Sequence, residues 1–406
     1  MIVTISGVKI RAVTLGMDLP APRVEAEPFK RAAKFLREAR EAFRAAGLEV
    51  QTTRIAGPEL GPTLSRMDLE AFGAWAAETE ATCRSFGVEY LSLGRIPTDR
   101  EDVVERIVPP VLAAGEVASV SADLIADGLP SVAMAVACAR AVRELSTRTP
   151  QGFGSFRFAA TANCPANIPF LPAAYHCGGQ PRFSVAVQAA DVVLEAVRGP
   201  GTLEQVEERL VTALERAARS AEQVAQELAA RFGHPLVGID LSPAPAPVDD
   251  VSIGGAVEAA GVERFGAPGT VYVAAMITRA IRRTRISRSG FSGLMLPVLE
   301  DSILAQRMSE RHLSVHELLL YSSVCGTGLD TVPLPGDVSE AELAGIYLDV
   351  AALSVALGGK PLTVRLLPVP GTSPGDSTTY NFEYFHNTRV PSVANAGIEG
   401  ILARSP

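Results

Sequence analysis

One cysteine lies in a glycine-rich segment late in the sequence, at residues 322–328 (SSVCGTG). Glycines let a backbone approach a ligand closely, and their N–H groups can hold an anion. A thiol beside a positive charge can act as a nucleophile or as an acid–base group. We therefore predict that Cys325 is catalytic and that Gly326, Thr327 and Gly328 bind the substrate. The alternative is a small buried side chain in a tight turn, since free cysteine is among the most buried residue types.

A histidine follows a tyrosine in an apolar segment, residues 165–183, that is broken by several prolines and glycines. Irregular segments of this kind often line pockets, and histidine transfers protons near neutral pH. We predict that His176 is the proton partner of Cys325 and that Tyr175 supplies a hydroxyl for substrate binding. The alternative is a histidine that only packs and is held by hydrogen bonds.

Acidic residues recur where predicted strands end. In α/β folds the ends of strands converge on the ligand site, so these carboxylates are expected to line one pocket. They also suit a hard divalent cation, although no metal motif of recognised spacing is present, and they suit turns and helix starts equally well. The predicted acid–base groups are Glu300, Asp301 and Asp330, and the predicted substrate-binding residues are Asp240, Ser242 and Asp376.

Cationic residues flank the predicted strand 361–369. Lys360 and Arg365 would complement the carboxylates, and a guanidinium pairs well with a carboxylate or phosphate. Arg365 is therefore predicted to bind the substrate. A solvated strand edge would explain both residues as well.

The elements that must position these residues alternate between strand and helix, which is typical of α/β proteins. The segment 101–126 has helical spacing, 184–231 is expected to form two long helices, and 322–337 is expected to be a loop. The remaining predicted strands are 2–15, 48–55, 88–96, 156–164, 236–242, 293–298 and 361–371, and the remaining predicted helices are 27–46, 68–86, 130–145, 269–283, 300–308, 314–320 and 339–357.

The amino-acid composition excludes several classes of protein. The chain has 406 residues, of which 47% are hydrophobic and 20% charged, so it can bury a large core. Its net charge of −8 and 6% aromatic content argue against a nucleic-acid partner. Five cysteines without a CxxC pair, no membrane-spanning stretch and no signal-peptide pattern at the start favour a soluble cytoplasmic protein.

Several motifs are missing. No GxGxxG follows the first predicted strand, and neither a Walker loop nor a GxSxG elbow is present. These absences argue against nicotinamide-dependent dehydrogenases, P-loop ATPases and α/β-hydrolases.

Segments spread over nearly the whole chain resemble, in the same order, those of a widespread bacterial and archaeal family, domain of unknown function 711. The resemblance implies a fold similar to the pyruvate formate-lyase-like barrel, with ten strands in two five-stranded halves and helices outside. It places the Cys325 segment where glycyl radical enzymes carry a catalytic cysteine. The matching segments are KIRAVTLGMD (9–18), NIPFLPAAYH (167–176), GIDLSPAPAP (238–247), VSIGGAVE (251–258), GFSGLMLPVLED (290–301), YSSVCGTGLDTVPLPGD (321–337), KPLTVRLLPVPG (360–371) and PGDSTTYNF (374–382).

The chain departs from glycyl radical enzymes at its end. Their Arg-Val-x-Gly-aromatic signature is absent, because Pro391 and Ser392 follow Arg389 and Val390. A stored radical is therefore not expected, and fold resemblance alone assigns no activity.

We expect one domain over residues 1–406, with pseudo-halves of about 1–200 and 201–406. The leading hypothesis is a non-radical lyase, isomerase or cyclase that acts on a small polar or anionic metabolite. The alternatives are a hydrolase or lyase that depends on a divalent metal and a catalytically silent metabolite-binding protein; the cofactor stays open. Apolar segments such as 130–145 suit either the core or a homodimer interface.

Overall fold

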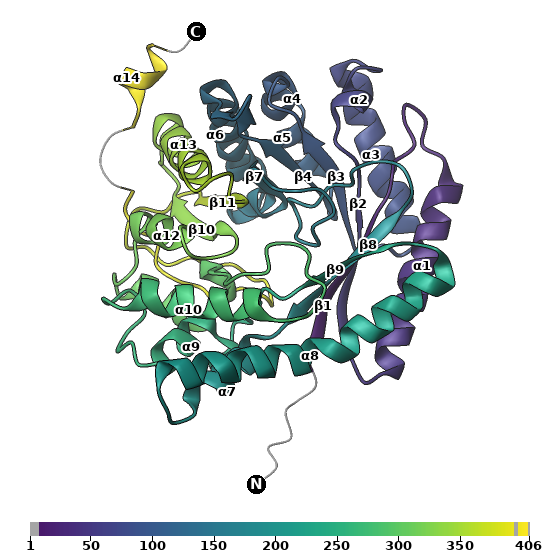
Figure 1. The fold of residues 1–406 in the computed structure, drawn as a ribbon. Helices are drawn as coiled ribbons and strands as arrows, with labels where there is room; N and C mark the ends of the chain where they lie inside the picture. The colour runs from purple at the N-terminus through teal and green to yellow at the C-terminus, as the bar shows by residue number, and fades with distance from the viewer. Residues whose placement is uncertain (1–7, 394–396, 405–406) are drawn as a thin grey trace.

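The structure, a computed structural model, describes residues 8–393 and 397–404. Nine strands form one curved sheet in the order β10-β11-β7-β4-β3-β2-β1-β8-β9, and helices lie around its outside (Figure 1). A separate two-stranded sheet pairs β5 with β6. The strands are β1 (Lys9–Gly16), β2 (Val50–Ala56), β3 (Tyr90–Ile96), β4 (Ala118–Asp123), β5 (Ile125–Ala126), β6 (Leu129–Pro130), β7 (Phe158–Ala162), β8 (Arg182–Gln188), β9 (Leu236–Asp240), β10 (Gly328–Pro335) and β11 (Leu362–Val369).

The sheet reverses direction twice. Strands β1, β2, β3, β4 and β7 are parallel to one another. Strand β8 pairs antiparallel with β1, and β11 pairs antiparallel with β7. Their outer neighbours β9 and β10 each run parallel to them. The sheet is therefore mostly parallel, and the predicted α/β class is confirmed.

The predicted ten-stranded barrel is not confirmed, because the described sheet has nine strands and is not closed. The segment between its two edges makes one isolated bridge to each: Arg288 to Ile239 of β9, and Pro297 to Asp330 of β10. Gly290 has a φ of +65°, and proline lacks the N–H that a ladder needs. The strand predicted at 293–298 does not form for this reason.

The helices match most of the predicted ranges. The 3-10 turns are η1 (Pro150–Arg157), η2 (Asp249–Val251) and η3 (Val298–Glu300). The α-helices are α1 (Ala26–Ala45), α2 (Gly61–Leu64), α3 (Leu69–Ser85), α4 (Glu101–Arg106), α5 (Val108–Ala114), α6 (Val132–Arg148), α7 (Ala190–Arg198), α8 (Leu203–Phe232), α9 (Ile253–Ala259), α10 (Thr270–Arg283), α11 (Ser302–Ser309), α12 (Val315–Ser322), α13 (Glu340–Ala356) and α14 (Glu399–Leu402).

Three further predictions of secondary structure were wrong. Strand β4 and most of β8 lie in segments that we expected to be helical, and β10 occupies half of the predicted loop 322–337. Five of the six residues of β4 and all eight residues of β10 are buried. Strands covered on both faces lose the alternation of polar and apolar residues, so short apolar runs do not distinguish them from buried helix. Residues 2–7 of the first predicted strand lie outside the described residues.

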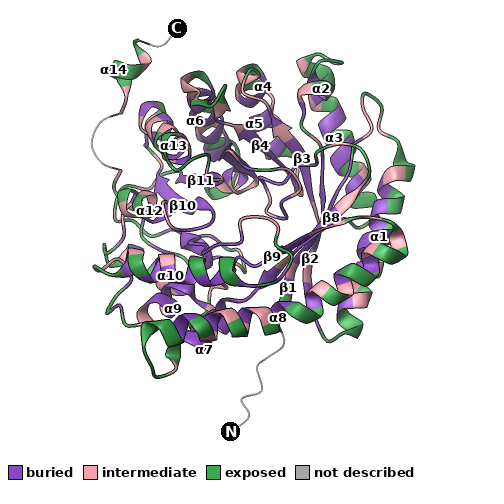
Figure 2. Cartoon of the chain, viewed as in Figure 1, coloured by how far each residue is buried: buried purple, intermediate pink, exposed green. Residues whose placement is uncertain are grey.

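The core lies between the sheet and the helices. Figure 2 shows the strands largely buried and the helices buried on one side and exposed on the other. In α1, Phe29, Leu36 and Phe43 recur at helical spacing and are buried. This spacing gives the helix one apolar face, which packs toward the sheet.

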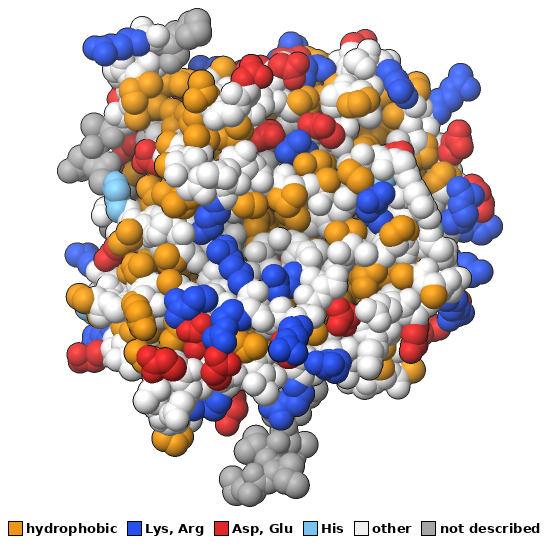
Figure 3. Space-filling view, viewed as in Figure 1, with side chains coloured by type: hydrophobic (Ala, Val, Ile, Leu, Met, Phe, Trp, Pro, Cys, Tyr) orange, Lys and Arg blue, Asp and Glu red, His pale blue; other side chains and the backbone are white. Residues whose placement is uncertain are grey.

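The long helix α8 starts and ends at clear sequence signals. The Thr202 hydroxyl accepts a hydrogen bond from the Gln205 amide, and Gly233 ends the helix in the left-handed conformation. Its neighbour α10 is joined to it by Arg279 and Arg283, which both pair with Glu207. Figure 3 shows basic and acidic side chains beside one another over this face. No described helix is long and apolar enough to cross a bilayer.

Candidate functional site

A buried arginine organises the interior of the sheet. Arg365 of β11 is 4% exposed and donates from Nε to Asp330 Oδ1 at 2.5 Å. Its Nη2 donates to Glu300 Oε1 at 2.9 Å. The guanidinium carbon lies 4.8 Å from the centre of the Phe156 ring and 5.1 Å from that of Phe170. Burial alone would lower the pKa of Arg365, but the two carboxylates raise it above its ordinary value.

A second arginine reaches the same carboxylate from the other side. Arg11 of β1 donates from Nη2 to Glu300 Oε2 at 2.6 Å. Each oxygen of Glu300 therefore accepts a hydrogen bond from one guanidinium. Together with Asp330 and Arg365, these residues form a cluster of two positive and two negative groups.

Asp330 is the most enclosed member of this cluster. Its side chain is fully buried, and its Oδ2 has no hydrogen-bond partner among the described residues. Burial raises the pKa of Asp330, although the charge of Arg365 acts against the increase. Asp330 therefore holds a proton more readily than an exposed aspartate does.

The cluster borders a cavity of about 90 Å³. Most of its polar lining comes from the amino-terminal halves of β1, β2, β3 and β4 and from the residue before β7, and its apolar lining is rich in phenylalanine. The lining residues are Arg11, Gln51, Thr52, Arg54, Tyr90, Val117, Ser119, Phe156, Arg157, Phe170, Leu171, Pro172, Glu300, Arg365, Phe382 and Tyr384.

Two further arginines of the lining have no carboxylate partner among the described residues. Arg54 donates to Thr52 Oγ1 at 2.9 Å and to Pro169 O at 3.3 Å. Burial, followed by the charges of Arg11 and Arg365, lowers the pKa of Arg54 to about 10. Arg157 donates from Nη1 to a backbone carbonyl at 3.1 Å and from Nη2 to another, and burial lowers its pKa. The lining therefore holds four arginines and one carboxylate, and we call it the cationic cavity.

Cys325 lies away from this cavity. Its side chain is buried, and its Sγ accepts a hydrogen bond from the Gly328 amide at 3.3 Å. The Gly326 amide donates to the Leu294 carbonyl at 2.6 Å. The predicted anion cradle of glycine amides is therefore wrong, because both amides already bind atoms of the chain.

Two other candidate residues have structural contacts. The Thr327 carbonyl accepts hydrogen bonds from the amide and the hydroxyl of Thr363. The Lys360 Nζ donates to the carbonyls of Ser322 and Ser323 at 2.7 and 2.9 Å, at the end of α12. Lys360 therefore caps a helix instead of facing the carboxylate cluster.

His176 lines a second cavity of about 540 Å³, near the carboxyl-terminal ends of β1 and β2. Its Nδ1 lies 3.0 Å from Asn167 Oδ1, and burial lowers its pKa. Tyr175 lines the same cavity, and its hydroxyl donates to the Cys164 carbonyl at 3.2 Å. Because Cys325 lines neither of these two cavities, the predicted pairing of thiol and imidazole is wrong.

One irregular segment lines both cavities. Phe170, Leu171 and Pro172 face the cationic cavity, whereas Ala166 and residues 175–178 face the second one. The segment predicted as a pocket-lining loop therefore lies between two pockets.

Two of the predicted carboxylates accept hydrogen bonds from backbone amides of separate segments. Asp240 accepts hydrogen bonds from the Ser242 amide and hydroxyl and from the amides of Phe291 and Ser292. A Cβ on Gly290 would lie 2.0 Å from Asp240 Oδ2, so only glycine fits beside this carboxylate. Burial raises the pKa of Asp240.

Asp301 has the same kind of role at two helix starts. Its oxygens accept hydrogen bonds from the first amides of α9 and α11 and from the Ser252 hydroxyl. Burial raises the pKa of Asp301 as well. Asp376 is exposed and accepts a hydrogen bond from the Ser373 amide at 2.8 Å.

The expected convergence of all five carboxylates is therefore wrong. Glu300 and Asp330 meet at Arg365, and the other three hold turns and helix starts. Within the part of the chain that the structure describes, no three His, Cys, Asp or Glu side chains are grouped to hold a metal ion.

The sequence reasoning missed most of the cationic cavity. The sequence predicts Arg11, Arg54 and Tyr90 only as parts of strands, and it gives no signal for Tyr384. One signal was available in residues 9–13 (KIRAV) and 52–56 (TTRIA), where an arginine lies within an apolar strand. An arginine is rarely buried unless it has a partner.

Fold and site thus define an α/β protein with a mostly parallel sheet and a cationic, aromatic-lined cavity inside it. Residues 1–383 match the family described as "Uncharacterised ACR (DUF711)", and the chain belongs to this family.

Its relatives carry the name UPF0210 protein. The one from Pyrobaculum arsenaticum is 40% identical over 236 residues, which cover 54% of this chain and 51% of that one. The chain thus spans about half the length of this relative. The one from Methanopyrus kandleri is 29% identical over 419 residues, covering 90% of this chain and 87% of that one.

Among solved structures, the chain is similar to the anaerobic ribonucleotide reductase from Thermotoga maritima, crystallised with citrate in the active site. The identity is 8%, the TM-score is 0.37, and the match covers 88% of this chain and 79% of that one. A TM-score this low carries no argument about fold or activity. The ten-stranded barrel and its catalytic cysteine stay predictions from family resemblance.

Proposed function

We propose that the cationic cavity binds a small anionic metabolite and that the protein transfers a proton to or from it, as an enzyme of the lyase or isomerase class. One observation carries the proposal: Glu300 lies on the cavity wall with a guanidinium on each oxygen, near the charge of Arg54. Guanidiniums recognise anionic oxygens with strong, directional hydrogen bonds. A carboxylate among them supplies a group that can accept a proton.

The chemistry follows from what the wall offers. Each oxygen of an ionised carboxylate has a second acceptor position, so Glu300 keeps capacity beyond its two arginines. Tyr90 and Tyr384 line the same cavity and carry hydroxyl donors. When a proton leaves a carbon beside a carboxylate, negative charge develops on oxygen, and hydroxyl and guanidinium donors stabilise it. The proton returns to another carbon in an isomerisation, or a leaving group departs in a lyase reaction.

A second candidate function has its own support. Because both oxygens of Glu300 already accept hydrogen bonds from guanidiniums, Glu300 is also suited to orienting Arg11 and Arg365 without exchanging a proton. The protein would then bind its metabolite without changing it. A catalytic role for Cys325 stays a prediction, and the same experiment tests it with a Cys325→Ala variant.

The test follows protons directly. The full-length protein is incubated in D₂O with short 2-oxo, 2-hydroxy and unsaturated carboxylic acids, and NMR records deuterium incorporation. We expect exchange at a carbon beside the carboxylate of at least one acid. Glu300→Gln should slow it by about 100-fold or more, the usual contribution of an acid–base group.

The matched control is Glu310→Gln, which removes an exposed carboxylate outside both cavities. It should leave exchange unchanged, and Cys325→Ala should do the same if the thiol is only structural. Binding without exchange would replace the enzyme by the silent binding protein. Equal exchange in Glu300→Gln and the wild type would contradict the proposed role of Glu300.

A further inference from the structure

The charges around the cationic cavity can be paired one by one. Arg11 and Arg365 face Glu300 and Asp330 at 2.5 to 2.9 Å, so these four groups balance. This inner cluster leaves no net charge for a ligand.

Arg157 is also accounted for. It donates to the carbonyls of Ala118 and Leu112, and Leu112 belongs to the last turn of α5. Carbonyls in the last turn of a helix have no partner within the helix and carry partial negative charge. Arg157 therefore caps α5, and its charge is compensated by the backbone.

Arg54 is the arginine of the lining that remains. Its two hydrogen bonds go to a hydroxyl and a backbone carbonyl, from Nε and Nη1. No described residue accepts a hydrogen bond from its Nη2. Its guanidinium carbon lies 5.8 Å from the centre of the Tyr90 ring, which also lines the cavity. One uncompensated positive charge with a free N–H group thus borders the cavity.

Six of the remaining lining residues are apolar, the others carry neutral polar groups, and the cavity is small. The apolar side chains of Phe156, Phe170, Leu171 and Pro172 line the wall and can contact a carbon chain. The cavity volume of about 90 Å³ is below the 150 Å³ or so of a cavity that takes up benzene. A ligand with one anionic end and a short carbon chain fits both the charge and the volume.

We propose that the cavity binds a short-chain monocarboxylate, with its carboxylate on Arg54 and its carbon chain against Phe170 and Leu171. The chain length that fits is about two to four carbons, because butanoate already has as many non-hydrogen atoms as benzene. The inference rests on the proposed function, whose site it shares, and it names the substrate class. Dicarboxylates and phosphate dianions bring two charges to one uncompensated cation, so they bind more weakly.

The experiment measures binding and not turnover. Isothermal titration calorimetry and thermal unfolding of the full chain are recorded with sodium acetate, propanoate, butanoate, octanoate, succinate and phosphate at equal ionic strength. We expect propanoate or butanoate to bind most tightly and to raise the unfolding temperature, since a ligand that binds the folded state stabilises it. Arg54→Gln should weaken that binding by about 10- to 100-fold, the effect of losing a charged hydrogen bond.

Two further variants keep the result interpretable. Arg54→Lys keeps the charge but loses the planar fork, so its affinity should lie between wild type and Arg54→Gln. Arg31→Gln, on the exposed side of α1, should bind as the wild type does. If Arg54→Gln does not fold, the Arg54→Lys titration decides.

Two outcomes would overturn the inference: tighter binding of succinate or phosphate than of propanoate and butanoate, or unchanged affinity in both Arg54 variants. Short monocarboxylates that bind through Arg54 but exchange no proton would leave the inference standing and remove the proposed enzyme activity. Proton exchange on a dicarboxylate would do the reverse.

Discussion

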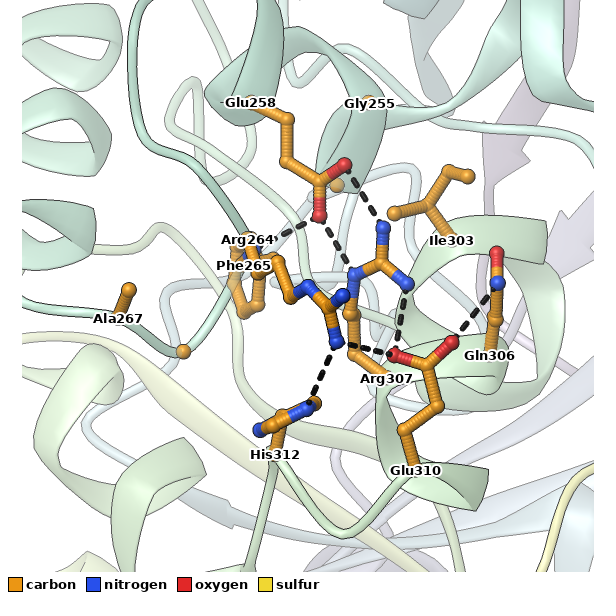
Figure 4. A network of polar contacts seen from close by, with 12 residues as sticks. Gly255, Glu258, Arg264, Phe265, Ala267, Ile303, Gln306, Arg307, Glu310 and His312 are labelled. Atoms are coloured by element: carbon orange, nitrogen blue, oxygen red, sulfur yellow. Dashed lines mark hydrogen bonds and ion pairs between the residues drawn. The ribbon is translucent and has the colours of Figure 1, made fainter.

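Two clusters of charged side chains in this protein have similar members but differ in how they are completed. On the outside, between α9 and α11, Arg307 binds both oxygens of Glu258 at 2.7 and 3.0 Å (Figure 4). Its Nη1 donates to Glu310 at 2.8 Å. Arg264 completes the cluster with contacts to Glu310 at 3.8 Å and to His312 Nε2 at 3.2 Å. Each of its charges has a partner.

The inner cluster has the same two-to-two balance of arginine and carboxylate, but Arg54 stands beside it without an anionic partner among the described residues. Unpaired charges are costly to remove from water, so a half-buried cation without its anion marks a place where an anion is expected to bind. The outer cluster joins two helices, whereas the inner cluster borders the cavity that we propose binds an anion. The number of ion pairs does not distinguish them; the unpaired charge does.

Removing the central arginine of the inner cluster should have the largest effect. Arg365→Ala leaves the buried carboxylate of Asp330 without its cation and leaves Glu300 paired with Arg11 alone. Breaking a buried ion pair in this way typically costs about 3–5 kcal/mol of unfolding free energy. Urea denaturation followed by circular dichroism measures the loss. Arg307→Ala in the outer cluster is the matched control and should cost clearly less. Equal losses in the two variants would mean that the clusters do not differ in burial cost.

The two clusters should respond to pH with opposite signs. Burial raises the folded-state pKa of Asp330, so its ionisation makes the folded state less stable as the pH rises above about 4, the ordinary aspartate value. For Glu310, burial acts to raise the pKa, but Arg307 and Gln306 prevail and lower it. Its contribution is therefore present above its unfolded-state pKa and is lost as the pH falls through the folded-state value.

Unfolding free energies of wild type, Asp330→Asn and Glu310→Gln between pH 3 and 7 test this contrast. Relative to wild type, Asp330→Asn should gain stability as the pH rises, whereas Glu310→Gln should lose it. Slopes of the same sign would refute the contrast between the two environments.

The smallest effect is expected at the edge of the outer cluster. Arg264→Ala removes an exposed guanidinium whose carboxylate contact is 3.8 Å long. Such surface pairs contribute about 0–1 kcal/mol, and added salt screens them. The thermal midpoint should therefore shift little, and the difference from wild type should vanish in high salt. A loss as large as that of Arg365→Ala would show that the outer cluster is not a surface network.

The sequence predicted the α/β class and most helices, because amphipathic spacing and capping residues are local. The start of α8 at Thr202 and its end at Gly233 are examples. It failed for β4, β8 and β10, because strands buried on both faces carry no alternation. Family resemblance led us to expect a closed barrel. The segment from Arg288 to Pro297 makes only isolated bridges to the two edge strands, because its glycines and its proline interrupt the backbone ladder.

For the site, the sequence identified Glu300, Asp330 and Arg365 as candidates, and the structure brings these three together. It could not find Arg54, because which side of a strand faces the interior depends on the register of the whole sheet. It paired Cys325 with His176 because both residue types suit catalysis. Residue type carries no information about distance, and the two side chains lie in different parts of the fold.

The segment that lines both cavities would link them thermodynamically if a bound ligand shifted it. Phe170 to Pro172 face one cavity, and Tyr175 to Gly178 face the other. A ligand that shifts this segment in one cavity changes the free energy of binding in the other. Linkage requires that effect to be reciprocal, so each ligand would alter the affinity of the other by the same factor.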